Sequence, residues 1–387
     1  MTSRDKAWVL HAGAVLDGGR FREKALCFDC GRVAETPHTD ALSFDADGLV
    51  IVPGMVDVHG DAFERNIAPR PGVHFDLDAA LIETDRQLVS NGITTAYLAV
   101  TVSWEPGLRS LATAVELMSA LERVRSRLVA DVRVQFRWEI TATSAVEPVC
   151  DWLSMEPTPT LAFNDHFTNL LGKPREVTML PQYAARSGLS PEAYRAHLDD
   201  VISQGDAIDR AVARIAGVAR HCGVPMFAHD EASIDMRRQY RALGVGVCEF
   251  PLTVDTAREA RAHGEAVVLG APNVVRGGSH TGAVHAGDAI ADGLCTVLST
   301  DYYYPALFGA AATLASTDLT RLAEAWSLVS RNAAAAVNLV DRGTLALGQR
   351  ADAIALNWTA DGPSINAVFV RGRPVFLSEP ERVRQPL

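Results

Sequence analysis

The sequence predicts an α/β fold: a (β/α)8 TIM barrel with a small β-sandwich domain that both ends of the chain build together. Three observations predict it. Eight apolar strand-like runs alternate with helix-length segments, short alternating strands occupy both ends, and ionisable residues follow the strand-like runs. The chain has 387 residues, 48% of them hydrophobic, which is enough for a barrel with a small second domain.

Both ends of the chain consist of short strands separated by turn residues. Residues 6–52 contain alternating segments such as WVLHAGAVLDGG and ALCFDCGRV, with no helix-length pattern between them. The stretch from 341 onward returns to this style in DRGTLALGQRADAIAL and AVFVRGRPVF. We therefore expect residues 1–52 and 341–387 to form the β domain, and residues 53–340 to form the barrel.

The middle of the chain alternates between strands and helices. The strand-like runs lie at 49–61, 93–102, 132–141, 159–166, 224–231, 245–251, 266–273 and 294–301. Helix-length segments separate them, including 77–92, 108–130, 191–222 and 234–244. Parallel strands joined by crossover helices give this alternation, and eight such units close a barrel.

Composition and charge exclude several kinds of partner. Lys and Arg total 36 against 47 for Asp and Glu, a net charge of −11 that offers no basic surface for nucleic acid. No stretch reaches the roughly 18 apolar residues of a membrane span, and the N-terminal residues do not resemble a secretory signal, so we expect a cytoplasmic protein without a membrane partner. An anionic substrate must then be held locally, by metal or by a few arginines.

Ionisable residues lie at the C-terminal ends of the strand-like runs, where a barrel of this kind places its chemistry. The candidate ligands are His59, Asp61, Glu139, His166, His229 and Asp301. Imidazoles and carboxylates without a thiolate suit Zn²⁺, Mn²⁺ or Fe²⁺. His59 and Asp61 are two apart on an extended strand, so both can bind one ion. Glu139 is placed to bridge to a second ion, completed by His166 and His229.

Asp301 follows the last run and has a second expected role. A carboxylate beside a metal-bound water can take a proton, so we expect Asp301 to act as the general base. The alternative is a helix cap, because a helix is expected after YYYP.

Two cationic segments lie near these strand ends. In APNVVRGGSHTG, Gly277 and Gly278 let backbone N–H groups approach a ligand, Arg276 supplies a cation, and His280 ends the loop. An ordinary glycine-rich turn is the alternative. In APRPGVHF, Arg70 lies between two prolines on a stiff backbone that can present its guanidinium to an anion, although a plain surface arginine fits as well.

At these residues the sequence resembles the PhnM family of diphosphatases, in the amidohydrolase superfamily. The resemblance rests on VPGMVDVHGD, APRPGV, NGITTA, CEFPLTVDTAREAR, LGAPNVVRGGSHTG, LSTDYYYPAL and DRGTLALGQRADAIAL. It implies hydrolysis of α-D-ribose 1-methylphosphonate 5-triphosphate to the 5-phosphate and pyrophosphate in phosphonate catabolism, by a metal-bridging hydroxide. It also implies two divalent ions, zinc first with manganese or iron as alternatives, held by the six ligands above, and contacts of Arg276 and catalytic His280 with substrate.

The chain departs from the family pattern at several positions where the resemblance implies substrate contacts. It has Gly60 where the family has threonine, FTNLLGK after His166, Glu231 in place of a second aspartate, and Ala283 in place of an asparagine. The expected substrate is a small molecule, a phosphorylated sugar. The open alternatives are hydrolysis of another phosphoester or of a C–N bond, and a binding scaffold without turnover, against which Asp301 argues. The sequence leaves the oligomeric state open, and a homo-oligomer is one of the alternatives.

Overall fold

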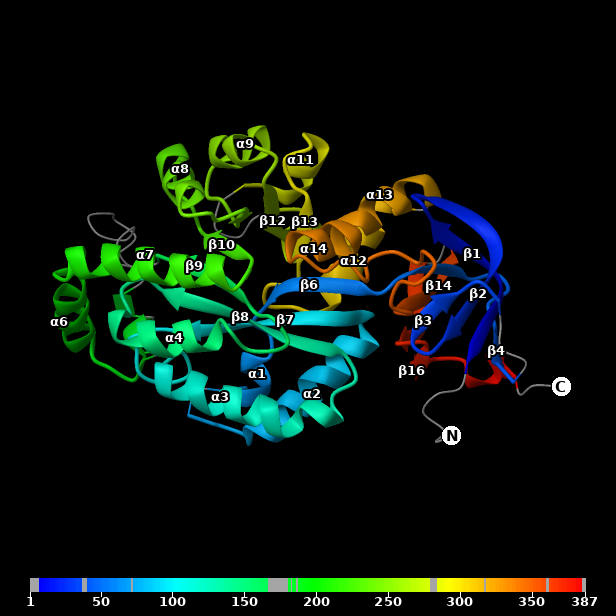
Figure 1. Cartoon of the computed structure of the whole chain (residues 1–387), viewed down its shortest axis with the longest axis horizontal. Helices are drawn as coiled ribbons and strands as arrows, with labels where there is room; N and C mark the ends of the chain where they lie inside the picture. Colours follow the sequence, from blue (N-terminus) through cyan, green and yellow to red (C-terminus); the bar gives the residue numbers. More distant parts are fainter. Residues whose placement is uncertain are drawn as a thin grey trace.

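The protein combines a parallel barrel with a sheet made from both ends of the chain (Figure 1). The structure is a computed structural model, and it describes residues 7–36, 40–70, 72–165, 180–181, 183–185, 187–278, 284–316, 318–359 and 362–384. Within that part of the chain no helix is both long and apolar enough to cross a membrane.

The barrel consists of eight parallel strands in the order of the sequence. They are β6 (Met55–Gly60), β7 (Ile93–Val102), β8 (Asp131–Glu139), β9 (Thr160–Asn164), β10 (Met226–His229), β11 (Val247–Glu249), β12 (Ala266–Gly270) and β13 (Val297–Ser299). Two backbone hydrogen bonds join the first strand to the end of the last: Asp301 N–H donates to the His59 carbonyl at 3.0 Å, and Asp61 N–H donates to the Asp301 carbonyl at 2.8 Å. The predicted (β/α)8 barrel is confirmed, and it closes at three of the candidate ligands.

Helices follow the strands and cover the outside of the barrel (Figure 1). They are α1 (Glu64–Ile67), α2 (Leu77–Ser90), α3 (Leu111–Val124), α4 (Val146–Trp152), α6 (Pro191–Ile202), α7 (Gly205–His221), α8 (Ile234–Ala242), α9 (Val254–Ala262), α10 (Ala271–Val275), α11 (Ala286–Ala291), α12 (Pro305–Ala315), α13 (Leu319–Val329) and α14 (Arg331–Ala336), with short 3-10 turns at Arg125–Arg127, Thr143–Ala145 and Pro380–Arg382. Side-chain caps set many of the starts, as where Asp76 accepts from Ala79 N–H and Ser110 accepts from Thr113 N–H.

The two ends of the chain pair into one nine-stranded sheet beside the barrel (Figure 1). Its strands are β1 (Trp8–Asp17), β2 (Arg20–Asp29), β3 (Arg32–Ala34), β4 (Leu42–Asp45), β5 (Val50–Pro53), β14 (Ala353–Thr359), β15 (Gly362–Val370), β16 (Arg373–Leu377) and β17 (Val383–Arg384). The β-rich unit that the sequence predicted is therefore one continuous sheet, in which β5 pairs with β14 across about 300 residues of chain. Side chains of this sheet form an apolar core that includes Phe28, Phe44 and Phe369.

An apolar layer fills the interior of the barrel and determines where polar side chains go. Ala162, Phe227 and Val247 belong to this layer, together with residues from the other strands. Side chains two positions apart on a strand point to the same side. Residues 164, 229 and 249 therefore lie one layer higher in the interior, at the C-terminal ends of β9, β10 and β11.

Candidate metal centre and active site

Four neighbouring strands end in polar residues on one level. In the pairing register Glu139 lies beside Asn164, Asn164 beside His229, and His229 beside Glu249. All four residues are buried. Since the layer beneath them is apolar, these side chains form the polar floor of the barrel mouth.

His59, Asp61 and Asp301 form a group that is suited to a metal ion. One ligand atom from each lies within 4.8 Å of the ligand atoms of the other two. The barrel-closing hydrogen bonds hold their backbones together, and Asp301 has a left-handed φ of 54°. Helix α12 begins at Pro305 with Tyr304 as its N-cap and has no side-chain cap. Asp301 therefore does not cap helix α12.

Gly60, which lies between His59 and Asp61 in the sequence, occupies a position that has no room for a larger residue. A β-carbon at residue 60 would lie 2.7 Å from Asp57 Oδ2 and 2.7 Å from Thr300 Oγ1. Thr300 donates to the Asp57 carboxylate from both its backbone N–H and its hydroxyl, at 3.0 and 2.5 Å. Asp57 thus accepts from Thr300, which follows β13 on the other side of the closure.

Glu249 is a site residue that the sequence analysis missed. Its Oε2 lies 2.7 Å from His229 Nδ1, and its Oε1 lies 3.1 Å from His59 Nδ1. Gln135 donates to Oε1 at 2.9 Å. His59, His229 and Glu249 also form a second group that could hold an ion. The signal was present, since Glu249 ends a strand-like run as the other candidates do.

A buried arginine lies among the candidate ligands and was also missed. The Arg137 guanidinium is 3.3 Å from Asp61 Oδ2 and 3.1 Å from His229 Nε2. On the other side of Asp61, Arg109 lies 3.6 Å from its carboxylate and donates twice to Glu64. Asp61 is therefore held between two guanidinium groups.

Burial and the surrounding charges set the protonation of these groups. Burial and the Arg137 charge lower the pKa of His229 to about 3, so its imidazole is neutral at neutral pH. Burial alone would raise the pKa of Glu249, but the two imidazoles outweigh it and hold the pKa well below its usual range. Burial also raises the pKa of Asp301. A neutral imidazole is the form that binds metal, and His229 has it. Burial opposes protonation of His59, but the Glu249 carboxylate raises the pKa of His59 against this effect, so that an ion at His59 competes with a proton.

The residues present fit a divalent ion. His59 is buried and pairs with the Glu249 carboxylate through Nδ1 at 3.1 Å, and it lies with Asp61 and Asp301 in a group of three possible ligands. The surrounding donors are imidazole nitrogens and carboxylate oxygens, which suit zinc, manganese or iron.

The other candidates lie in different places. Glu139 lies on the polar floor but in neither three-residue group. Arg70 is exposed in a turn that pairs with Val73. Much of the expected loop after β12 is helical, because α10 covers residues 271–275; Arg276 is its C-cap, followed by Gly277 with φ 71° and by Gly278. His166 and His280 lie outside the described residues, so their positions stay predictions.

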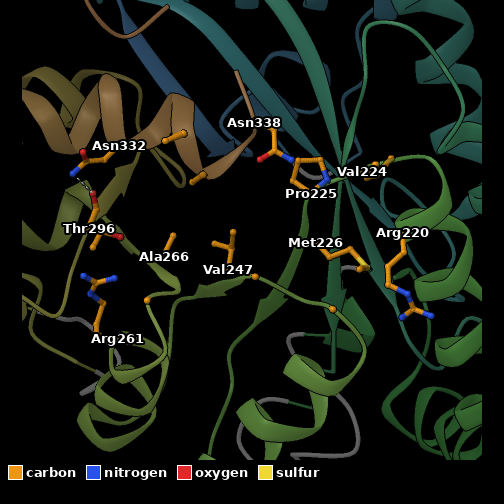
Figure 2. A pocket seen from close by; sticks show the side chains of 16 residues that line it. Arg220, Val224, Pro225, Met226, Val247, Arg261, Ala266, Thr296, Asn332 and Asn338 are labelled. Atoms are coloured by element: carbon orange, nitrogen blue, oxygen red, sulfur yellow. Dashed lines mark hydrogen bonds between the residues drawn. The ribbon is translucent and has the colours of Figure 1, made fainter. Parts of the chain in front are cut away.

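The opposite end of the barrel carries a cavity of about 730 Å³ (Figure 2). It lies at the N-terminal ends of β10 to β13, between Arg220 and Arg261, and Asn332 donates to the Thr296 carbonyl on its wall. None of the candidate residues that the structure describes lines it. His59, His229 and Asp301 lie at the other end of the barrel, at the C-terminal ends of the strands.

Comparisons with known proteins find a related sequence and similar folds. The chain is 29% identical over 340 residues to the α-D-ribose 1-methylphosphonate 5-triphosphate diphosphatase of Escherichia coli K12, covering 86% of this chain and 90% of that protein. Among solved structures it is similar to a β-aspartyl dipeptidase of Fervidobacterium islandicum, with TM-score 0.63, 14% identity and coverage of 96% and 97%. It is equally similar to a 5-methylcytosine deaminase of Klebsiella pneumoniae, with TM-score 0.63, 14% identity and coverage of 96% and 98%. These two share the fold. No protein-family profile matches the chain.

Proposed function

We propose that the chain hydrolyses the triphosphate of a phosphorylated sugar and releases pyrophosphate, because it is a homologue of the PhnM diphosphatases and has an amidohydrolase-type fold. The proposed substrate is α-D-ribose 1-methylphosphonate 5-triphosphate or a close relative. The carrying observation is that His59, Asp61, His229 and Asp301 converge at the mouth of the barrel in a chain related to that diphosphatase.

We propose two divalent ions, zinc first, at this mouth. His59, Asp61 and Asp301 would hold one, and Glu139, His166 and His229 would hold the other. Charge supports bound cations: five carboxylates stand at the mouth, at residues 61, 139, 230, 249 and 301, and they outnumber the two guanidinium groups, of Arg137 and Arg109, that contact Asp61. When bound, such ions supply Lewis acids and lower the pKa of water.

The chain's own residues would bind and move protons as follows. Water attacks a phosphorus of the triphosphate, one P–O bond to the leaving pyrophosphate breaks, and Asp301 accepts the proton of the water. Its raised pKa, caused by burial, brings this carboxyl closer to neutral pH and makes it a better proton acceptor. Glu249 holds the ring of His229 through Nδ1, which directs Nε2 into the mouth.

The test is a product analysis of the metal-loaded protein with α-D-ribose 1-methylphosphonate 5-triphosphate, nucleoside triphosphates and a panel of amides. We expect pyrophosphate and the sugar 5-phosphate in equal amounts from the sugar triphosphate. In ¹⁸O-water, label in the 5-phosphate would place the attack at the phosphorus nearest the sugar, and label in pyrophosphate at the middle one. Hydrolysis of amides with no release of pyrophosphate would overturn the proposal and favour a C–N hydrolase.

The cysteines bear on the compartment. All six are free thiols, and two of them, Cys248 and Cys295, are buried in the apolar core that includes the helices around the barrel. Thiols are kept reduced in the cytoplasm. We propose that the enzyme works there.

A further inference from the structure

Two arginines and a tyrosine lie together at the rim of the barrel mouth. The Arg276 guanidinium donates to the Tyr302 hydroxyl at 3.4 Å. The Arg65 guanidinium lies over the Tyr302 ring, 5.9 Å from its centroid, within the range of a cation–π contact. Tyr302 thus brings two positive charges, from segments more than 200 residues apart, to one place.

This cluster is attached to the backbone of the candidate metal ligands. Tyr302 follows Asp301 directly, and Arg65 follows Asp61 by four residues, in the short helix α1. The two aspartates are joined by a backbone hydrogen bond of 2.8 Å. Arg65 and Arg276 therefore contact the segment that carries Asp301, and Arg65 lies on the segment that follows Asp61.

Charge explains why such a cluster is needed. Asp61, Asp230 and Asp301 make the mouth negative, and the whole chain has a net charge of −11. The net charge of the chain repels an approaching polyphosphate, and cations at the entrance to the mouth reduce this repulsion. Arg137 and Arg109 are already engaged by the aspartate and glutamate carboxylates inside. Arg65 and Arg276 are exposed and carry their charge at the entrance.

We infer that Arg65, Tyr302 and Arg276 form a clamp for the terminal phosphates of a polyphosphate substrate, an inference that rests on the proposed function. The guanidinium groups bind the phosphate oxygens that lie beyond the bond to be broken, and the Tyr302 ring fixes the spacing between them. The clamp favours triphosphates over monophosphate esters, because a single phosphate at the metal centre does not extend to the rim.

The test measures binding of inorganic tripolyphosphate by titration calorimetry to the purified metal-loaded protein and to Arg65→Met, Arg276→Met and Tyr302→Phe. Arg86→Met is the matched control, since Arg86 is exposed on helix α2 and pairs with Glu83. We expect each clamp arginine variant to bind at least about tenfold more weakly, Tyr302→Phe a few-fold more weakly, and the control as the wild type does. The double arginine variant should lose less than the product of the two single losses, because both side chains contact one ligand. Metal content, measured before and after, shows whether the probe removes the ions.

The outcomes separate the clamp from the proposed function. Loss of tripolyphosphate binding in the arginine variants supports the clamp even if the wild type releases no pyrophosphate, in which case the proposed function alone fails. Binding within twofold of wild type in both arginine variants overturns the clamp, whatever the turnover. Absence of tripolyphosphate binding by the wild type overturns it as well. With a substrate in hand, the clamp variants should raise KM for the triphosphate more than they lower kcat.

Discussion

Glu249→Gln tests how the imidazoles of the metal centre are oriented. The carboxylate now accepts at both oxygens, from Gln135 at Oε1 and beside His229 Nδ1 at Oε2. A glutamine side chain has one oxygen and one NH₂ group in place of the two carboxylate oxygens. Its NH₂ group must therefore face either the Gln135 NH₂ group or His229 Nδ1, and one hydrogen bond is lost. The charge-assisted contact is lost as well, at a cost of about 1.5–3 kcal/mol.

Loss of this contact should appear in metal affinity. If the NH₂ group faces His229, the ring no longer donates from Nδ1, and the tautomer with its proton on Nε2 cannot bind an ion through that atom. Residues that orient metal ligands are typically worth 10–100-fold in affinity, about 1.4–2.7 kcal/mol, which agrees with the lost contact. We expect Glu249→Gln to weaken metal binding by this factor in competition with a chelator.

The matched control for Glu249→Gln is Asp85→Asn. Asp85 is a buried carboxylate of helix α2. It accepts from Val129 N–H and Ala130 N–H, at 2.9 Å each, and these two residues lead into the N-terminal end of β8. The Asp85→Asn substitution should lower the free energy of unfolding and leave metal affinity unchanged. Metal affinity of Glu249→Gln within twofold of wild type would refute the orienting role of Glu249.

Three further predictions follow from single contacts. Asp301→Asn should keep the fold and reduce turnover by roughly 10²-fold or more, and unchanged turnover would remove it from the mechanism. Gly60→Ala should lower the free energy of unfolding by about 1–3 kcal/mol, because the added β-carbon would lie 2.7 Å from two oxygen atoms. Gly217→Ala in helix α7 is the control and should not lower it, because the space around Gly217 is open. Equal denaturation midpoints for the two variants would contradict the clash at residue 60. Burial opposes ionisation of Asp131, but arginines including Arg342 at 2.6 Å outweigh it and hold its pKa at about 2, so its contribution to stability is present above about pH 4 and is lost as the pH falls toward 2. Asp131→Asn should therefore lower the unfolding free energy by about 1–2 kcal/mol at pH 7 and by much less at pH 2, and a loss independent of pH would contradict this.

The barrel could be predicted from the sequence because parallel strands buried on both faces leave continuous apolar runs. Each predicted run contains one barrel strand, and the candidate ligands His59, His229 and Asp301 do stand at the strand ends. The arrangement of the terminal strands could not be predicted in the same way. Alternation shows which residues are strands, but the pairing of β5 with β14 depends on contacts between distant segments.

The missed residues share a physical reason. Glu249 ends a strand-like run as the other candidates do, but its contacts with His59 and His229, like those of Arg137 with Asp61 and His229, form only when distant strands become neighbours in the barrel. An arginine within an apolar strand gives no sign of which face it occupies until the register is known. Arg65 lies in a helix of four residues, too short for any periodic pattern. Interactions between strands, more than residue types, therefore define this site.

Arg137 offers a last test of the charge balance at the mouth. Its guanidinium stands 3.1 Å from His229 Nε2 and 3.3 Å from Asp61 Oδ2, so it competes with a cation for both ligand atoms. A single and a double positive charge roughly 6 Å apart repel by about 5 kcal/mol at an effective dielectric constant of 20, and the surrounding carboxylates offset part of this. Arg137→Met keeps most of the volume and removes the charge, whereas Arg137→Lys keeps the charge.

We expect Arg137→Met to bind metal at least about tenfold more tightly than Arg137→Lys in chelator competition, and to bind it at lower pH. The loss of two donors to Asp61 and His229 should at the same time lower the free energy of unfolding of the metal-free protein by about 1–3 kcal/mol. The two measurements have opposite signs in one variant, which a general loss of structure cannot produce. Equal or weaker metal binding by Arg137→Met than by Arg137→Lys would show that the guanidinium supports the ions instead of competing with them.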